Sequence, residues 1–289
     1  MMKRIRTALC LILAAALLAG CAFLPSESEP EALASADPLT GHPLEWPGQR
    51  PVAVTIENST ASVTQWGISS ASVVLEALTE AGMATELCLV YPALAATPKV
   101  GPVAAGQDIY WRLLVGQQPL PVQRGGGQFD QNYLDYYSIR AVDALEAGRT
   151  AFDCGSEWSN APLWYTSGSA VSKVLDALSI SAVLTESRVT SAASAAATSA
   201  SSGSDAVLTV PALLPQEEDG KLPDATAPDA VNVRVCFDDN NATGFAYDPD
   251  SGLYRMFHAD GTPQLDANNG QQAGFDNLLV LFSASALRD

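Results

Sequence analysis

"PVAVTIE", residues 51–57, is the stretch that decides the fold. Its apolar residues Val52, Val54 and Ile56 alternate with small or polar residues, and this period of two residues predicts a β-strand. Two more apolar runs downstream predict further strands: "ELCLVYP" (86–92) and "PLPVQR" (119–124).

Between these strands, apolar residues recur at helical spacing. In "SSASVVLEALTEAG" (69–82), serines precede the apolar positions and Gly82 supplies a C-terminal stop, so this stretch predicts a helix. Three more helices are expected at 107–114, 129–137 and 169–180, and a short strand or turn at 139–145.

Strands that alternate with helices favour a layered α/β architecture with parallel strand pairs. After Val231 the pattern becomes a β-meander, with strands expected at 231–237, 243–248, 253–258 and 277–283. We therefore expect an α/β fold of mixed α+β type. It would be a layered sandwich with a partly parallel sheet flanked by helices, followed by the C-terminal meander.

The N-terminus predicts an exported lipoprotein. Lys3, Arg4 and Arg6 precede an apolar run (8–18) that is shorter than the about 20 residues of a membrane span and fits a signal peptide. The run ends in "LAGC" (18–21), which resembles a bacterial lipobox, so Cys21 is the expected lipidation site. The alternative is an ordinary signal peptide followed by a chance cysteine.

Composition divides the chain into five parts. We expect a signal peptide at 1–20, a flexible tether at 21–36, an α/β domain at 37–186, a low-complexity loop or linker at 187–229, and the meander at 230–289, packed on the α/β domain. Because Ala22 follows Cys21, the inner-membrane retention signal of Gram-negative sorting is absent. The expected location is the outer side of the cell membrane, most simply in a Gram-positive envelope.

The net charge of the chain argues against two classes of binding partner. The formal net charge is −17, and without residues 1–20 the chain keeps 12 Lys and Arg against 32 Asp and Glu, a charge of −20. This balance disfavours nucleic acid, whose phosphates need clustered basic residues. It also disfavours adhesion to anionic lipid, so the expected contact with the membrane is the lipid on Cys21.

Cysteine and histidine give little support for a metal or a catalytic base. After processing, Cys88, Cys154 and Cys236 remain besides Cys21, which allows at most one disulfide among them and leaves open whether one forms. No cysteine or histidine spacing indicates a metal site, and we expect neither metal nor cofactor. His42 and His258 are interpreted as surface residues.

Several motifs in order resemble one family. "DPLTGHPL", "RPVAVTIENS", "SSASVVLEALTEAG", "VGPVAAG" and "LWYTS" resemble the YerB-like bacterial lipoproteins, whose domain has no known function. The likeness covers roughly residues 37–180 and the strands after 231. It implies an exported lipoprotein with a mixed α/β sandwich, and it implies no catalytic activity.

The chain departs from the family at the polar positions of these motifs. Ala104 and Gln107 stand where the family typically has arginines, and Arg124 stands where it has a histidine before a glycine pair. Because ligands of open parallel sheets bind beyond the carboxyl ends of the strands, we predict a shallow binding cleft there. Its expected residues are Asn58, Gly101, Pro102, Gln107, Arg124, Gly125, Gly126, Gly127, Tyr165 and Thr166.

Two readings of "RGGGQF" (124–129) stay open. A glycine run that leads from a strand into a helix exposes backbone N–H groups beside Arg124, which suits an anion. The same run is also typical of a purely structural turn.

Two classes of function remain open as well. The first is a non-enzymatic envelope lipoprotein that binds a ligand or protein partner. The second is an envelope hydrolase or transferase acting on a wall polymer through carboxylates such as Glu57 or Asp108. The missing histidines and arginines favour the first.

Overall fold

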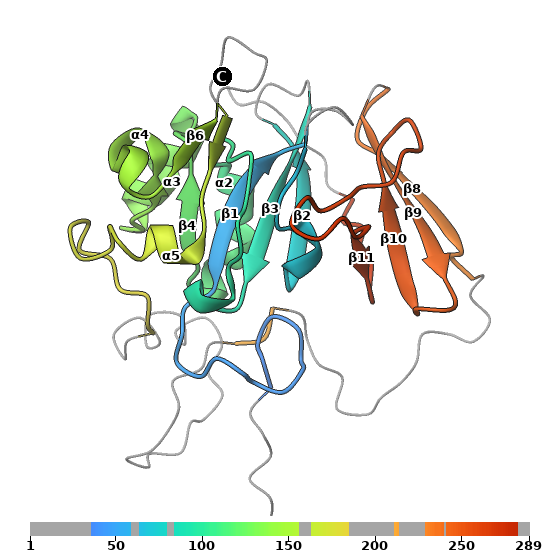
Figure 1. The fold of residues 1–289 in the computed structure, drawn as a ribbon, viewed down its shortest axis with the longest axis horizontal. Coiled ribbons are helices and arrows are strands. Elements are labelled where there is room, and N and C mark those ends of the chain that lie inside the picture. The colour runs from blue at the N-terminus through green and yellow to red at the C-terminus, as the bar shows by residue number, and fades with distance from the viewer. Residues whose placement is uncertain are drawn as a thin grey trace, which may run out of the picture. The chain divides into compact units, whose positions relative to one another are not determined.

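The computed structural model describes residues 36–58, 64–79, 84–155, 163–184, 211–213, 229–239 and 241–282. The described strands form a five-stranded sheet of order β2-β3-β1-β4-β5, a four-stranded sheet of order β11-β10-β9-β8 and a two-stranded ribbon, β6-β7 (Figure 1). The predicted signal peptide, Cys21 and nearly all of the tether lie outside the described residues.

The five-stranded sheet is mixed. Its strands are β1 (Val52–Glu57), β2 (Val73–Leu78), β3 (Thr85–Tyr91), β4 (Leu120–Gln123) and β5 (Val142–Asp143). β1 pairs antiparallel with β3 and parallel with β4, β2 pairs antiparallel with β3, and β4 pairs parallel with β5. The prediction of a partly parallel sheet is confirmed.

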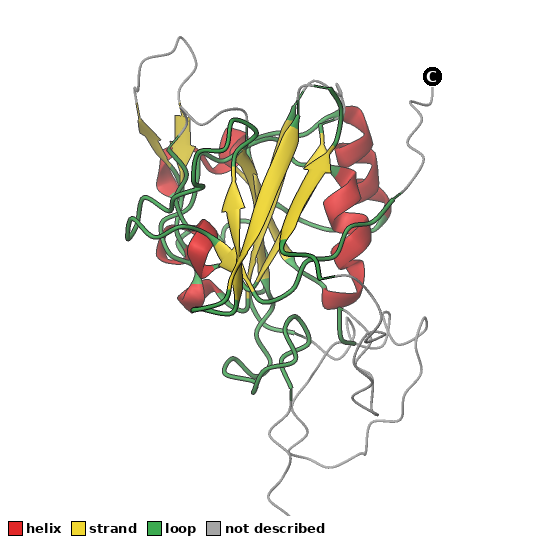
Figure 2. Cartoon of the chain, turned by 90° about the vertical axis from the view of Figure 1, so that its right-hand side faces the viewer, coloured by secondary structure: helices red, strands yellow, loops and turns green. Residues whose placement is uncertain are grey.

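Each face of this sheet carries its own apolar core, because side chains alternate across a strand. Val52, Val54 and Ile56 of β1 belong to one core, which Met256 and Ala273 of the C-terminal region complete. Ala53 belongs to the core on the other face, together with Cys88 and Val90 of β3. Helices lie on both sides of the strands (Figure 2).

The helices of the second core are α2 (Asp108–Leu114) and α3 (Gln128–Tyr136), both close to their predicted positions. They contribute Tyr110, Trp111, Leu114, Tyr133 and Leu134 to that core. Shorter helices complete the described part: α4 (Ala144–Ala147), α5 (Gly168–Val171), and the 3-10 turns η1 (Ile68–Ser70), η2 (Leu94–Ala96), η3 (Val115–Gln117) and η4 (Gly148–Thr150).

The helix predicted at 69–82 is wrong, because this stretch contains the strand β2. Its residues pair with β3 from Val73 opposite Val90 to Leu78 opposite Thr85. All six side chains are half-buried, so neither face shows the clear alternation of a strand with one solvated side. Consecutive apolar residues then imitate the spacing of a helix.

The helix predicted at 169–180 is regular only over α5. After Val171 the chain continues in turns, with bonds such as Lys173 N–H to Ala170 C=O that span three residues instead of four. Val174, Leu175 and Ile180 are nevertheless buried in the first core. The apolar spacing therefore predicted correctly which residues are buried, but it predicted a regular helix where the chain forms turns.

The C-terminal meander consists of β8 (Asn232–Cys236), β9 (Ala242–Asp248), β10 (Leu253–Phe257) and β11 (Gly274–Phe275). Its first three strands agree with the prediction. The fourth was expected at 277–283, but residues 277–282 are irregular and their apolar side chains are largely exposed. An apolar run alone does not make a strand, because a strand also needs a backbone partner.

The ribbon strands β6 (Asp153–Gly155) and β7 (Leu163–Tyr165) pair antiparallel beside the main sheet. The short strand or turn expected at 139–145 is β5 followed by α4. Within the described residues, no helix has the length and apolar character needed to cross a membrane.

Candidate functional site

Three segments meet at the carboxyl ends of β1 and β4, which run parallel. The N–H of Glu57 donates to the carbonyl of Pro102 (2.9 Å), and the N–H of Arg124 donates to the carbonyl of Ala104 (2.8 Å). The N–H of Gly106 in turn donates to the carbonyl of Gly125 (2.8 Å). We call this region the strand-end site, which comprises Asn58, Gly101, Pro102, Gln107, Arg124, Gly125, Gly126 and Gly127.

The structure thus brings the three predicted segments to one edge of the sheet. Their backbones are fixed by mutual hydrogen bonds, whereas their side chains point in different directions. That these residues bind a ligand stays a prediction.

Asn58 and Gln107 lie on opposite faces of the sheet. The Nδ2 group of Asn58 donates to Glu76 (3.0 Å) and Thr85 (2.9 Å), on the face that also contacts the meander. The Nε2 group of Gln107 donates to Glu86 (2.9 Å). Because side chains alternate along β3, Glu86 shares the face of Cys88, which belongs to the α2–α3 core. The predicted pair of amides in one cleft is therefore split by the sheet.

The glycine loop is occupied by the chain's own carboxylates. Both oxygens of Asp143 accept from the N–H of Gly125 (2.9 and 3.0 Å), and an oxygen of Asp143 caps α4 at Leu145. The buried carboxylate of Asp130 lies against Gly126, where an added Cβ would overlap one of its oxygens. These contacts favour the structural-turn reading of "RGGGQF" over an open anion site.

Tyr165 and Thr166 lie beside Gly101 but are buried. Thr166 exchanges two backbone hydrogen bonds with Val100, and its hydroxyl donates to the carbonyl of Ala151 (2.7 Å). A Cβ on Gly101, whose φ is +146°, would meet the ring of Tyr165 at 2.8 Å. Glycine is required there, because the Gly101–Pro102 turn lies close against the ring of Tyr165.

Arg124 is the cation of the strand-end site, and its charge acts on the carboxyl of Glu57. The Nε atom of Arg124 is buried and has no hydrogen-bond partner within the described residues. Burial raises the pKa of Glu57, and the positive charge of Arg124 partly opposes this rise. Of the two carboxylates weighed for catalysis, Glu57 therefore has the perturbed environment, whereas Asp108 is paired with Arg112 on the surface (2.7 Å).

Two acidic residues that the sequence did not single out join the meander to the main sheet. Asp266 is fully buried and accepts from the N–H groups of Gly67 and Ser69 (both 3.0 Å) and from the hydroxyl of Ser69 (2.7 Å). Glu76 accepts from the hydroxyl of Thr243 on β9 (2.7 Å). Glu76 lies within the motif at 69–82, but the residues that each acid joins across the two regions are 167 to 199 positions apart in the chain, so no local pattern indicated these contacts.

The pKa values of these two acids shift in opposite directions. Burial dominates at Glu76 and raises its pKa, although Thr243, Thr85 and Asn58 donate to it. Burial also acts to raise the pKa of Asp266, but the N–H and O–H donors from Gly67, Asn268 and Ser69 outweigh it and lower the pKa.

The remaining reactive side chains are dispersed. Cys88, Cys154 and Cys236 are all free thiols, and burial raises the pKa of Cys88 well above its usual value. Burial lowers the pKa of His258, which follows β10. Among the described residues, no three His, Cys, Asp or Glu side chains gather closely enough to hold a metal ion.

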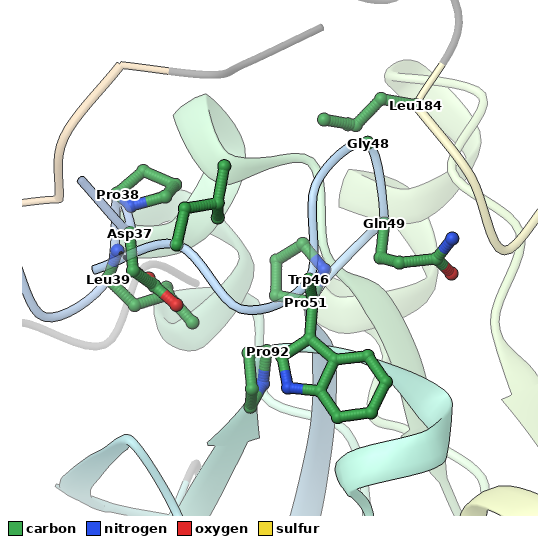
Figure 3. A pocket seen from close by; sticks show the side chains of 10 residues that line it. Asp37, Pro38, Leu39, Trp46, Gly48, Gln49, Pro51, Pro92 and Leu184 are labelled. Carbon is green, nitrogen blue, oxygen red and sulfur yellow. Dashed lines mark hydrogen bonds between the residues drawn. The ribbon is translucent and has the colours of Figure 1, made fainter. Parts of the chain in front are cut away.

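A separate pocket opens at the opposite edge of the sheet, where β1 begins (Figure 3). Pro38, Leu39, Trp46, Pro51 and Pro92 give it an apolar lining. β1 spans six residues, so this pocket lies about 20 Å from the strand-end site at 3.3 Å per residue. The sequence did not single it out.

Comparison with known families decides the affiliation of the chain. The N-terminal domain of the proteins of unknown function DUF3048 matches residues 39–181, and the C-terminal domain of the same family matches residues 232–289. The chain belongs to the DUF3048 family. The resemblance to YerB-like proteins is thereby confirmed.

Among solved structures, the chain is similar to the crystal structure of the YerB protein from Bacillus subtilis. The TM-score is 0.63 at 22% sequence identity, over 83% of this chain and 72% of that one. At this identity the similarity shows the shared DUF3048 fold. No curated protein matches the chain.

Proposed function

We propose that this DUF3048 protein is a lipid-anchored envelope protein that binds a ligand or partner at the strand-end site without chemical turnover. The anchor would be the lipid on Cys21, and the folded part would face the outside of the cell membrane. The observation that supports binding is the placement of Arg124. Its backbone lies at the junction of three hydrogen-bonded segments, and its Nε atom is a donor that no described residue uses.

The nature of the site favours a ligand with an acceptor group. Arg124 can donate to a carboxylate, phosphate or carbonyl oxygen, and the surrounding backbone is already fixed, so little ordering is lost on binding. The glycine loop adds little, because Asp143 occupies the N–H of Gly125. We infer that Arg124 is the principal polar contact and that wall polymers, which carry such acceptors, are the first ligands to test.

A binding assay with insoluble cell-wall sacculi tests this proposal. Arg124→Ala should weaken cosedimentation about tenfold or more, because a hydrogen bond to a charged group contributes roughly 1.5–3 kcal/mol. The melting temperature should stay nearly unchanged. Arg112→Ala is the matched control, since it removes an exposed arginine of α2 that is paired with Asp108, and it should leave binding intact.

Equal binding by the wild-type chain and Arg124→Ala would contradict the proposal, and so would the absence of binding to any wall fraction. A large loss of stability in Arg124→Ala would make this residue structural and leave the site without a function.

A second candidate function is that of an envelope hydrolase or transferase, and the raised pKa of Glu57 supports it. Glu57 lies directly opposite Glu86 in the β1–β3 register, and two neighbouring carboxyls in different environments are a common acid–base arrangement. The same assay tests it: soluble fragments released from sacculi by the wild-type chain, but not by Glu57→Gln, would favour the enzyme over the binding protein.

A further inference from the structure

Residues 211–213, the sequence Pro-Ala-Leu, lie within the predicted linker and yet are docked on the folded domain. The N–H of Leu213 donates to the carbonyl of Pro38 (2.6 Å), and the Nε2 group of Gln117 donates to the carbonyl of Pro211 (3.1 Å). Figure 1 shows this short light-orange segment beside the blue N-terminal loop. We call residues 211–213 the clasp.

The contacts of the clasp are those by which proteins recognise extended peptides. Backbone hydrogen bonds fix the direction of the peptide, and a side-chain pocket selects its sequence. The backbone of Leu213 bonds Pro38, and its side chain packs against the core that contains Leu39. The ring of Pro211 comes near Gly116, where an added Cβ would stand 3.6 Å away.

Gln117 has the features of a residue that recognises a peptide backbone. Its side chain is 3% exposed and belongs to η3, which directly follows α2, so its position is held by the helix. Its Nε2 group is used by the clasp, whereas its Oε1 atom is buried without a hydrogen-bond partner in the described part of the chain. A buried amide with a spare acceptor suits a peptide backbone, which offers both C=O and N–H.

The surface continues beyond the clasp into the apolar pocket. Pro38 bonds the clasp and also lines this pocket, together with Leu39, Trp46 and Pro92 (Figure 3). Aromatic and proline side chains of this kind form the grooves that bind proline-containing extended peptides. A peptide longer than the clasp would thus find apolar contacts next to Pro38.

We propose that Pro38, Leu39, Gln117 and the adjoining pocket form a peptide-binding site for an extended Pro-x-Leu segment of a partner protein, and that the clasp is an internal ligand of this site. The partner's leucine N–H bonds the carbonyl of Pro38, and its proline carbonyl accepts from Gln117. The site lies at the opposite edge of the sheet from the strand-end site and does not depend on that proposed function.

The clasp competes with any partner because it belongs to the same chain. A tethered segment acts at an effective concentration in the millimolar range. The unaltered chain therefore binds a free peptide weakly, and release of the clasp exposes the site.

A labelled peptide with the sequence of residues 208–216, LTVPALLPQ, provides the test by fluorescence anisotropy. Leu213→Asp in the full chain removes the clasp, since a carboxylate does not pack in an apolar core. This variant should bind the peptide at least about tenfold more tightly than the unaltered chain. Adding Gln117→Ala should weaken binding by about fivefold, which is the usual effect of one lost hydrogen bond. A peptide with aspartate at the position of Leu213 is the control and should not bind.

The proposal is overturned if the released chain binds the peptide no better than the unaltered chain, or if it binds the control peptide equally well. Amide hydrogen exchange provides a second test, which needs no variant. Excess peptide added to the unaltered chain should accelerate exchange at the N–H of Leu213, whereas an unchanged rate contradicts displacement of the clasp.

Discussion

At the scale of single residues, the acids Asp266 and Glu76 join the C-terminal region to the rest of the fold, and their pKa values shift in opposite directions. Asp266 is held as a carboxylate by donors from Gly67 and Ser69, near the N-terminus of η1. Glu76 is held by Asn58, Thr85 and Thr243, but burial dominates and raises its pKa. Both carboxylates are hydrogen-bonded within the chain, so we expect their substitution to change the stability of the fold.

Asp266→Asn should destabilise the chain by roughly 1.5–3 kcal/mol at neutral pH, because hydrogen bonds to a charged group are lost or weakened. The pKa of Asp266 is lowered on folding, so its contribution is present above the unfolded pKa and disappears as pH falls through the folded pKa. Urea unfolding at several pH values measures this. The variant should therefore lose less stability between neutral and acidic pH than the wild-type chain.

Glu76→Gln is the matched control, with the opposite sign. Because the folded pKa of Glu76 is raised, its charge opposes folding at neutral pH and this cost disappears as pH falls. The amide keeps an acceptor oxygen for Thr243, so the variant should be as stable as the wild-type chain or more stable at neutral pH. A steeper loss in acid for Asp266→Asn than for the wild-type chain would contradict the role given to Asp266.

At the scale of elements, the linker predicted at 187–229 is attached to the folded domain at the clasp. Most of this stretch lies outside the described residues, but residues 211–213 are bound to Pro38 and Gln117. The clasp is therefore a docked point within the predicted loop or linker, because its backbone is hydrogen-bonded and Leu213 packs on the core.

Limited proteolysis with an enzyme of broad specificity should cut first on either side of the clasp, within 187–210 and 214–229. Bonds within residues 211–213 should be cut more slowly, since a protease needs its substrate free and extended. Mass spectrometry of the early fragments identifies the sites. Leu213→Asp should abolish the protection, whereas first cuts inside α2 or α3 would contradict this account of the linker.

At the scale of the whole molecule, the two regions that match DUF3048 share one core. Met256 and Ala273 of the C-terminal region are buried with Val52, Val54 and Ile56 of β1. The meander is therefore part of the same hydrophobic unit as the main sheet.

Cys21→Ser should move the protein from the membrane fraction to the soluble fraction and remove the mass of the lipid. The reason is that acyl chains on Cys21 are the proposed anchor, and a mature chain with a charge of −20 has little affinity for anionic lipid. Cell fractionation and mass spectrometry measure both effects. Cys10→Ala, within the predicted signal peptide, should change neither, and a Cys21→Ser protein that stays in the membrane would refute the anchor.

The sequence by itself determined the features that depend on local patterns of residues. The alternation in 51–57 specified β1, the helical spacing in 107–114 and 129–137 specified α2 and α3, and ordered motifs specified the family. The order of strand ends also predicted which backbone segments meet at the strand-end site. These features depend on neighbouring residues or on chain order, which a single sequence contains.

Only the tertiary structure decided the rest. It made 73–78 a strand by pairing it with β3 and half-burying both of its faces, and it placed Asn58 and Gln107 on opposite sides of the sheet. It also filled the glycine loop with Asp143, joined Asp266 to Gly67 across 199 residues, and fixed the clasp on Pro38. Each of these outcomes depends on contacts between residues distant in sequence, and such contacts leave no periodic trace along the chain.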